Sequence, residues 1–303
     1  MQALISIVAI YFFIFIGYFA KKVFKSEINE RTLILISMYF LQPILTFWGL
    51  TRTPINPTLL FLPIVYLSVI FTTLVILIIV SKNIFTNSKE RSILIATSLI
   101  GNTGNLGIPL GIALFGEQSV AYTSIINIAN VFFIYTFGVY FFAKSQYTFK
   151  QSLSSMIKIP ILWFAIIALV YNYMGYSINS NIQKALQMGA YATIVIQLII
   201  FGIYLAQVNL RKFDYKISFG VSFVKLLLLP ILGMFFSIVF SLDPLIASML
   251  IVSLSTPLAV NNVNNAALFD CKPYLVTSLV FLTTVLFLFL FYFDLQIINM
   301  VFK

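Results

Sequence analysis

Two polar stretches that each contain a proline decide the fold: Gly101-Asn-Thr-Gly-Asn-Leu-Gly-Ile-Pro109 and Ser253-Leu-Ser-Thr-Pro-Leu-Ala-Val-Asn-Asn262. Each stretch interrupts an apolar run that is long enough to cross a bilayer, for which about 20 residues suffice. The two prolines, Pro109 and Pro257, are 148 residues apart, which is close to half of the 303-residue chain. The sequence therefore predicts two halves that carry matching interruptions.

The composition is that of an integral membrane protein. Hydrophobic residues make up 61% of the chain and charged residues 9%, and the mean hydropathy is +1.05, whereas soluble domains carry about 25% charged residues. This excludes a soluble enzyme, a nucleic-acid-binding protein and a disordered chain. The chain has no His and a single Cys, Cys271, so we expect no intrachain disulfide, no zinc or iron site and no cofactor.

Ten apolar runs are long enough to span a membrane as helices. They cover residues 3–20, 32–51, 59–81, 92–115, 119–143, 157–176, 185–207, 217–240, 244–268 and 274–298. The first run lacks a preceding basic region and a cleavage pattern of small residues. We therefore expect it to remain as the first helix rather than to act as a cleaved signal.

The Lys and Arg residues alternate between the two sides of these runs. Fourteen fall in the loops after the odd-numbered runs: Lys21, Lys22, Lys25, Arg31, Lys82, Lys89, Arg91, Lys144, Lys150, Lys158, Arg211, Lys212, Lys216 and Lys272. Three fall on the other side: Arg52, Lys184 and Lys303. Because cytoplasmic loops collect basic residues, we expect a multi-pass protein of the plasma (inner) membrane with both termini on the non-cytoplasmic side.

The basic loop at 144–158 divides the ten helices into five and five. We expect a first repeat at residues 1–143, a cytoplasmic linker at 144–156 and a second repeat at 157–303. Because five is odd, the second repeat enters the membrane in the opposite sense to the first. The predicted fold is all-α, with two inverted five-helix repeats whose fourth and ninth helices are broken at Pro109 and Pro257. Interrupted helices at corresponding positions of two inverted repeats are typical of transporters, and they mark where the substrate binds.

The fourth run is suited to unwinding. Three glycines within 101–107 permit non-helical dihedral angles, and Pro109 suits the first position of a new half-helix. The N-terminus of that half-helix would direct free N–H groups and a partial positive charge at the midplane, where they favour an anion. Polar side chains between the glycines add neutral donors and acceptors: Asn102, Thr103 and Asn105. The alternative is a close-packed glycine face with a proline kink.

Four asparagines follow Pro257 within five residues of the ninth run: Asn261, Asn262, Asn264 and Asn265. Amides in so apolar a run need partners. We therefore expect them to line a hydrated cavity or to join the ninth helix to the fourth by hydrogen bonds. Three further sets of amides are weaker candidates, and for the last two we favour a structural role: Asn127 with Asn130 in the fifth run, Gln42, and Gln197.

Lys225 is the one charged residue deep inside a predicted span, about 13.5 Å along a helix from Lys216. An ionisable residue at this depth is a candidate functional residue, and the alternative is that its stem extends back to the cytoplasmic surface. The eight Asp and Glu residues fall in loops or near helix ends. We therefore expect neither a carboxylate proton relay nor an acid-liganded sodium site in the membrane core, although neutral oxygens would still suit sodium.

The sequence resembles the auxin efflux carrier family, within the wider group that includes the bile-acid sodium symporters. The resemblance rests on 101–109, on Leu41-Gln-Pro43-Ile-Leu-Thr-Phe47 and on Lys225-Leu-Leu-Leu-Leu-Pro230, which are similar to the family's motifs in the fourth, second and eighth helices. It implies that helices one, two, six and seven form a scaffold that also dimerises. Helices three to five and eight to ten would then form a moving domain in which the fourth and ninth helices cross. The family carries small organic anions, including indole-type auxins.

The predicted function is a secondary transporter that moves a small organic carboxylate by alternating access. Its other predicted partners are membrane lipid and a second copy of the chain, with no nucleic acid. The predicted substrate-binding residues are Asn102, Thr103, Asn105, Pro109, Asn130, Lys225, Pro257, Asn261 and Asn262. A channel or receptor is the alternative, but polarity is concentrated in two interruptions rather than in stripes along several helices. A membrane enzyme would need acid clusters, His or a metal, so we expect no enzymatic activity.

Overall fold

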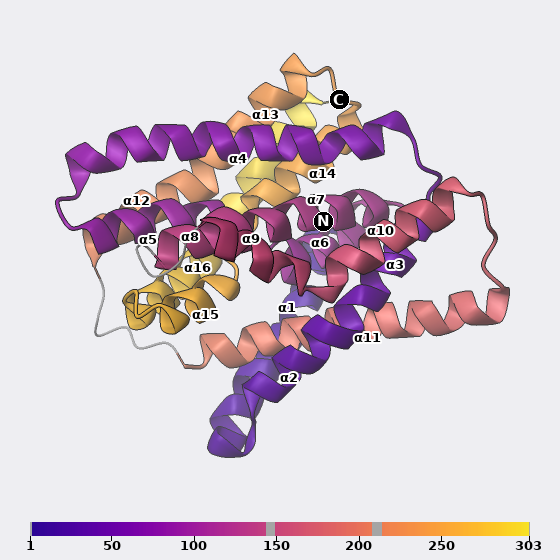
Figure 1. Cartoon of the computed structure of the whole chain (residues 1–303), viewed down its shortest axis with the longest axis horizontal. Helices are drawn as coiled ribbons and strands as arrows, with labels where there is room; N and C mark the ends of the chain where they lie inside the picture. Colours follow the sequence, from indigo (N-terminus) through magenta and orange to yellow (C-terminus); the bar gives the residue numbers. More distant parts are fainter. Residues whose placement is uncertain (1, 144–148, 208–213, 303) are drawn as a thin grey trace.

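The chain is built from helices (Figure 1). The computed structural model describes residues 2–143, 149–207 and 214–302. Four basic residues of the charge pattern lie outside the described residues: Lys144, Arg211, Lys212 and Lys303. The first part of the expected linker, 144–148, also lies outside them. Six helical stretches are long and apolar enough to cross a membrane: Glu30–Thr51, Pro57–Ile84, Ser119–Ala143, Ser180–Leu205, Tyr215–Val239 and Pro273–Val301. Throughout the described ranges the architecture is all-helical.

The helices follow the predicted apolar runs in order. Those of the first half are α1 Gln2–Phe24, η1 Lys25–Glu27, α2 Glu30–Ile36, η2 Ser37–Leu41, α3 Gln42–Thr51, α4 Pro57–Ile84, α5 Ser88–Leu99, η3 Thr103–Gly107, α6 Ile108–Phe115, α7 Ser119–Phe133, η4 Ile134–Gly138 and α8 Val139–Ala143. Those of the second half are α9 Phe149–Ile157, α10 Pro160–Tyr173, α11 Ser180–Leu205, α12 Tyr215–Phe223, η6 Val224–Leu228, α13 Leu229–Val239, α14 Pro244–Ser255, α15 Asn261–Leu268 and α16 Pro273–Val301. The short helix α9 occupies part of the segment that the sequence predicted as a linker.

Several helices begin where the local sequence supplies a cap. A side-chain oxygen of Asn or Asp accepts a hydrogen bond from a first-turn N–H at the start of six helices: Asn29, Asn56, Asn87, Asn179, Asp214 and Asp243. Such caps satisfy donors that the helix itself leaves unpaired. In α4 and α14 a proline follows the cap, at a position where its missing N–H has no consequence.

Three of the π-helical turns, η2, η3 and η6, end two residues before a proline. One residue separates each π-helical turn from its proline, and the N–H of this residue donates to the carbonyl five positions earlier: Gln42 to Ser37, Ile108 to Thr103 and Leu229 to Val224. A proline has no N–H and its ring crowds the carbonyl four residues earlier, so one extra residue is accommodated in the preceding turn. The predicted break at Pro109 is therefore wrong, because Pro109 lies inside a helix that runs from Thr103 to Phe115.

The helices pack as two groups. In the first group, α1 packs along α11, and α3 packs against α10 and α11. In the second group, α4 packs against α5, α7 and α13, while α14 packs against α7, α13 and α16. Figure 1 shows α4 on one side of the molecule and α1, α2 and α11 on the other. The groups meet where α3 contacts α7, α1 contacts α6 and α11 contacts η3.

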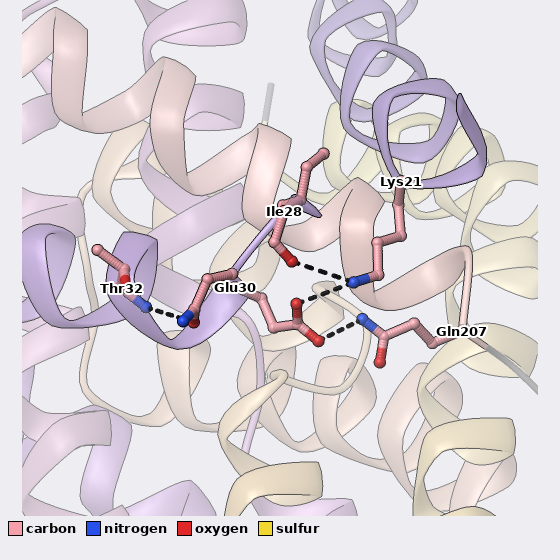
Figure 2. A network of polar contacts seen from close by, with 6 residues as sticks. Lys21, Ile28, Glu30, Thr32 and Gln207 are labelled. Atoms are coloured by element: carbon pink, nitrogen blue, oxygen red, sulfur yellow. Dashed lines mark hydrogen bonds and ion pairs between the residues drawn. The ribbon is translucent and has the colours of Figure 1, made fainter. Parts of the chain in front are cut away.

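A polar network ties together three helix ends of the first group (Figure 2). The ammonium group of Lys21 in α1 donates to Glu30 Oε2 at 3.0 Å and to the Ile28 carbonyl at 3.2 Å. Gln207, which follows α11, donates to Glu30 Oε1 at 2.8 Å. The ends of α1 and α11 are thus held at the start of α2.

Two glycines allow α1 and α11 to cross in close backbone contact. A Cβ atom on Gly17 would overlap the Ile199 carbonyl oxygen, and one on Gly202 would overlap the Ile14 carbonyl oxygen. Both obstacles are backbone atoms, which cannot rotate away as a side chain can. Small residues at such crossings are typical of helix packing in membranes.

We predict that Gly202→Ala destabilises the protein. Ala has a higher helix propensity than Gly by about 1 kcal/mol, but the overlap with Ile14 forces the helices apart, and overpacking of this kind costs about 1–3 kcal/mol. The midpoint of thermal unfolding in detergent should fall. Gly220→Ala is the matched control, because its Cβ would meet only the end of the Leu94 side chain, at 3.1 Å. An equal fall in both variants would show that the α1–α11 crossing is not the cause.

Candidate functional site

The two interruptions lie against each other. The chain is non-helical between α5 and η3, at 100–102, and between α14 and α15, at 256–260. Asn102 N donates to the Pro257 carbonyl at 2.8 Å, and Ala259 N donates to the Ile100 carbonyl at 3.1 Å. The two segments run antiparallel, with Gly101 opposite Leu258. Backbone groups that lose their helical partners in a membrane need others, and each interruption supplies them for the other.

Asparagine side chains complete this pairing. Asn262 Nδ2 donates to the Ile100 carbonyl at 3.0 Å, and Asn130 Nδ2 donates to the Gly101 carbonyl at 2.9 Å. Asn130 Nδ2 also lies 2.9 Å from Thr103 Oγ1. The backbone carbonyls of the first interruption are thus bound from two sides, by α15 and by α7.

A tyrosine and a second asparagine hold this arrangement in place. Tyr66 of α4 donates to Asn130 Oδ1 at 3.1 Å, and Thr103 Oγ1 donates to Asn127 Oδ1 at 2.9 Å. The sequence singled out Asn130 but treated Asn127 as a weak candidate and missed Tyr66. A tyrosine in an apolar run is common, so only the buried hydroxyl and its partner reveal its role.

Lys225 supports the site from inside the protein. Its side chain is fully buried, and Nζ donates to the Leu254 carbonyl at 2.8 Å. Leu254 is in the last turn of α14, where unpaired carbonyls and the helix dipole favour a positive charge. The alternative that the stem extends to the cytoplasmic surface is therefore wrong, and Lys225 is not among the described residues that line the cavities below.

One acid lies deeper than the sequence predicted. Asp294 is in α16, which continues for seven residues beyond it to Val301, and its side chain is buried. Its carboxyl lies beside the hydroxyl of Ser255, the last residue of α14. The expectation that all acids fall in loops or near helix ends is thus wrong for Asp294, which is buried about two turns before the end of α16.

Two adjoining cavities open next to the paired interruptions. The first is lined by Gln42 and by five asparagines: Asn102, Asn105, Asn127, Asn130 and Asn261. The second shares Gln42, Asn105 and Asn261 with the first and extends between α2, α10 and α11. Its further lining mixes apolar and polar side chains: Ile34, Met38, Tyr135, Ile159, Ile161 and Ile200 lie beside Ser37, Gln197 and Asn264. None of the described residues that line either cavity carries a formal charge.

Helix N-termini face the first cavity. Asn105 lies in the first turn of the helix that begins at Thr103, and Asn261 is the first residue of α15. First-turn amides of a helix carry a partial positive charge, but in α15 those of Asn262 and Val263 already donate to the carbonyls of Ala259 and Val260. In addition, Asn102 Nδ2 is buried without a hydrogen-bond partner among the described residues. The cavity therefore offers neutral donors to a ligand that brings negative charge.

The structure sorts the predicted substrate-binding residues into three sets. Four line the cavities: Asn102, Asn105, Asn130 and Asn261. Three lie behind the cavity wall and join the interruptions: Thr103, Pro257 and Asn262. Two are buried and do not line the cavities: Pro109, inside the helix, and Lys225, whose amine lies beside Gly101 and binds the Leu254 carbonyl. Gln42 and Gln197, for which the sequence favoured a structural role, both line the second cavity.

The chain also matches known proteins over nearly its whole length. Residues 2–293 match the model of a family described as membrane transport protein. An uncharacterized transporter of Methanocaldococcus jannaschii, MJ1031, is 26% identical over 285 residues, which is 89% of this chain and 91% of that protein.

The chain belongs to the membrane transport protein family, which is that of the auxin efflux carriers. The predicted resemblance is thus confirmed. The protein is a multi-pass membrane transporter and not an enzyme.

We predict that Gly101→Ala disturbs the pairing of the interruptions. A Cβ on Gly101 would lie 2.5 Å from Lys225 Nζ, so the amine would have to leave the Leu254 carbonyl and remain buried without that bond, which costs about 1–3 kcal/mol. Thermal unfolding in detergent should shift to lower temperature. Gly107→Ala is the matched control, since its Cβ would make an ordinary contact with Thr256 at 3.5 Å. Unchanged stability of Gly101→Ala would contradict the proposed packing.

Proposed function

We propose that the protein is a secondary transporter that carries a small organic anion through the two adjoining cavities by alternating access. The observation that carries the proposal is the set of donors at the paired interruptions, where asparagine side chains of η3, α7 and α15 and the first turn of the helix that begins at Thr103 meet at one cavity. Half-helix ends at the midplane are the usual substrate sites of transporters.

The lining of the cavities favours a substrate with a single carboxylate. A carboxylate accepts hydrogen bonds from neutral amides, and Asn102 Nδ2 is a buried donor with no acceptor among the described residues. A second carboxylate would need a Lys or Arg side chain or further donors, and the described lining supplies no cation. The isoleucines and Met38 of the second cavity suit an apolar body attached to the carboxylate.

The helix arrangement is consistent with ten spans in two inverted repeats. The six long stretches become ten when α1, α10 and the two interrupted pairs, α5 with η3–α6 and α14 with α15, are added. In this proposal the interrupted helices cross at their paired segments, the first helix group is the scaffold that also forms a homodimer, and the second group moves. Both termini lie on the non-cytoplasmic side of the plasma membrane.

This orientation places the second cavity on the cytoplasmic side. Its lining includes Ile34 and Ser37, near the start of the Glu30–Thr51 stretch, and Ile159, next to the start of α10. The charge pattern assigns both of these helix ends to the cytoplasm. The structure would then represent an inward-facing state.

Binding of organic acids to the purified protein tests the proposed substrate class. We expect aromatic or branched aliphatic monocarboxylates to raise the unfolding temperature in a thermal-shift assay, since a ligand at 100 times its Kd stabilises by about 2.7 kcal/mol. The corresponding neutral amides and dicarboxylates are the controls. Stabilisation by the amides to the same extent, or by dicarboxylates alone, would contradict a site for one carboxylate.

We predict that Asn105→Ala and Asn261→Ala lower uptake of such an acid into proteoliposomes about 10-fold or more, since each loses a donor to the substrate worth about 1.5–3 kcal/mol. Their folded yield should change little, because both side chains are only partly buried at the cavity wall. Asn181→Ala, at an exposed position near the start of α11, is the control. Uptake at the parent rate in both cavity variants would remove Asn105 and Asn261 from the substrate site.

A further inference from the structure

One carboxylate joins the two helix groups at the end of the molecule remote from the second cavity. Glu117 lies in the turn between α6 and α7, where Gly116 adopts a φ of 77°. Glu117 Oε2 forms an ion pair with Arg52 at 2.6 Å, and Oε1 accepts hydrogen bonds from Gln187 at 3.2 Å and from the Tyr191 hydroxyl. Arg52 follows α3, and the other two partners are on α11. We name this set of four residues the Glu117 clamp.

The partners of Glu117 are held in place within the first group. The Arg52 guanidinium lies 4.7 Å from the ring centroid of Trp48, which is almost fully buried. The rings of Trp48 and Tyr191 are 5.8 Å apart. Stacking of this kind orients an arginine before it binds a carboxylate. Glu117 therefore docks on a surface that is already formed, and a shift of the second group would withdraw it.

The other ion pairs of the described residues do not cross between the groups. Lys21–Glu30 lies within the first group, whereas Lys89–Asp270 and Lys272–Glu90 lie within the second. Arg52–Glu117 is the one pair that joins the groups in these parts of the chain. Near the second cavity the groups are joined by a neutral hydrogen bond, from the Tyr204 hydroxyl to Asn264 Oδ1 at 2.8 Å.

The clamp and the second cavity occupy opposite ends of one helical stretch. Ser37 lines the second cavity, and Arg52 follows it by 15 residues in nearly continuous helix, which corresponds to about 22 Å. Below the clamp, Val120 and Ser124 of α7 pack directly on Gly49 of α3, and both side chains are buried. The two helix groups are thus in close contact next to the Glu117 clamp.

We propose that the Glu117 clamp is the outer gate of the transporter, and that its rupture is required for the outward-open state. The inference rests on the proposed alternating-access function. Residues that bind only in one of two states bias the equilibrium toward that state by their differential interaction. The clamp contributes its ion pair and hydrogen bonds to the inward-facing state alone, so weakening it increases the population of the outward-open state.

Removal of the ion pair tests the gate. Glu117→Gln keeps the size of the side chain and an oxygen for Gln187 and Tyr191, but it loses the charge that pairs with Arg52. We expect the outward-open population to rise at least about 5-fold. The readout is the rate at which an impermeant maleimide, added outside intact cells, labels Ser124→Cys in a Cys271→Ala background. The rate should rise by the same factor.

A second cysteine separates gate opening from general loosening. Ser37→Cys, in the second cavity, should be labelled more slowly in inside-out vesicles when Glu117→Gln is present, because the inward-facing state is depleted. Faster labelling at both positions would indicate a loosened protein and would overturn the proposal. Labelling needs no substrate, so an incorrect substrate class would leave these results unchanged.

Glu90→Gln is the matched control, since Glu90 pairs with Lys272 inside the second group at 2.7 Å. Labelling of Ser124→Cys should stay within about 2-fold of the parent rate in this variant. If Glu117→Gln folds poorly, Arg52→Gln should give the same increase, and the exchange of charges in Arg52→Glu with Glu117→Arg should return the rate toward that of the parent. Equal labelling rates in the parent, Glu117→Gln and Arg52→Gln would refute the gate.

Discussion

The antiparallel backbone pairing between the two interrupted helices is the interaction on which the rest of the structure depends. Non-helical backbone is unstable in a membrane core unless its N–H and carbonyl groups find partners. Here Asn102 and Ala259 donate across the pair to Pro257 and Ile100. The side chains of Asn130 and Asn262 donate to the neighbouring carbonyls of Gly101 and Ile100 from opposite sides. This requirement explains why Asn130 and Asn262 lie inside apolar runs.

The pairing also sets the electrostatics of the site. It brings four half-helix ends to one place, of which the N-termini of η3 and α15 face the cavity and the C-terminal end of α14 binds the buried amine of Lys225. The Lys225 amine satisfies a carbonyl at that C-terminal end of the helix. The cavity itself is left with uncharged donors. Under the proposed function, these uncharged donors would bind the carboxylate of the substrate.

The sequence predicted the helices well because apolar length and basic loops are direct consequences of the bilayer. It predicted both interrupted stretches, but it placed the break of the first at Pro109, whereas the chain is non-helical at 100–102. The π-helical turn Thr103–Gly107 accommodates Pro109 without a break, and composition does not encode this detail of backbone geometry. It could not distinguish Asn105, which lines the cavity, from Asn262, which braces the backbone. Tyr66, Asp294 and Glu117 acquire their roles only from residues far away in the chain, so no local pattern marks them.

Hydrogen–deuterium exchange of the protein in nanodiscs tests the central claim most directly. The account predicts that peptides covering 99–103 and 257–260 exchange as slowly as neighbouring helical peptides, although neither segment is helical, because the amides of Asn102 and Ala259 are bonded across the pair and buried. Exchange of both segments at the rate of an exposed loop would contradict the pairing, and with it the proposed origin of the cavity.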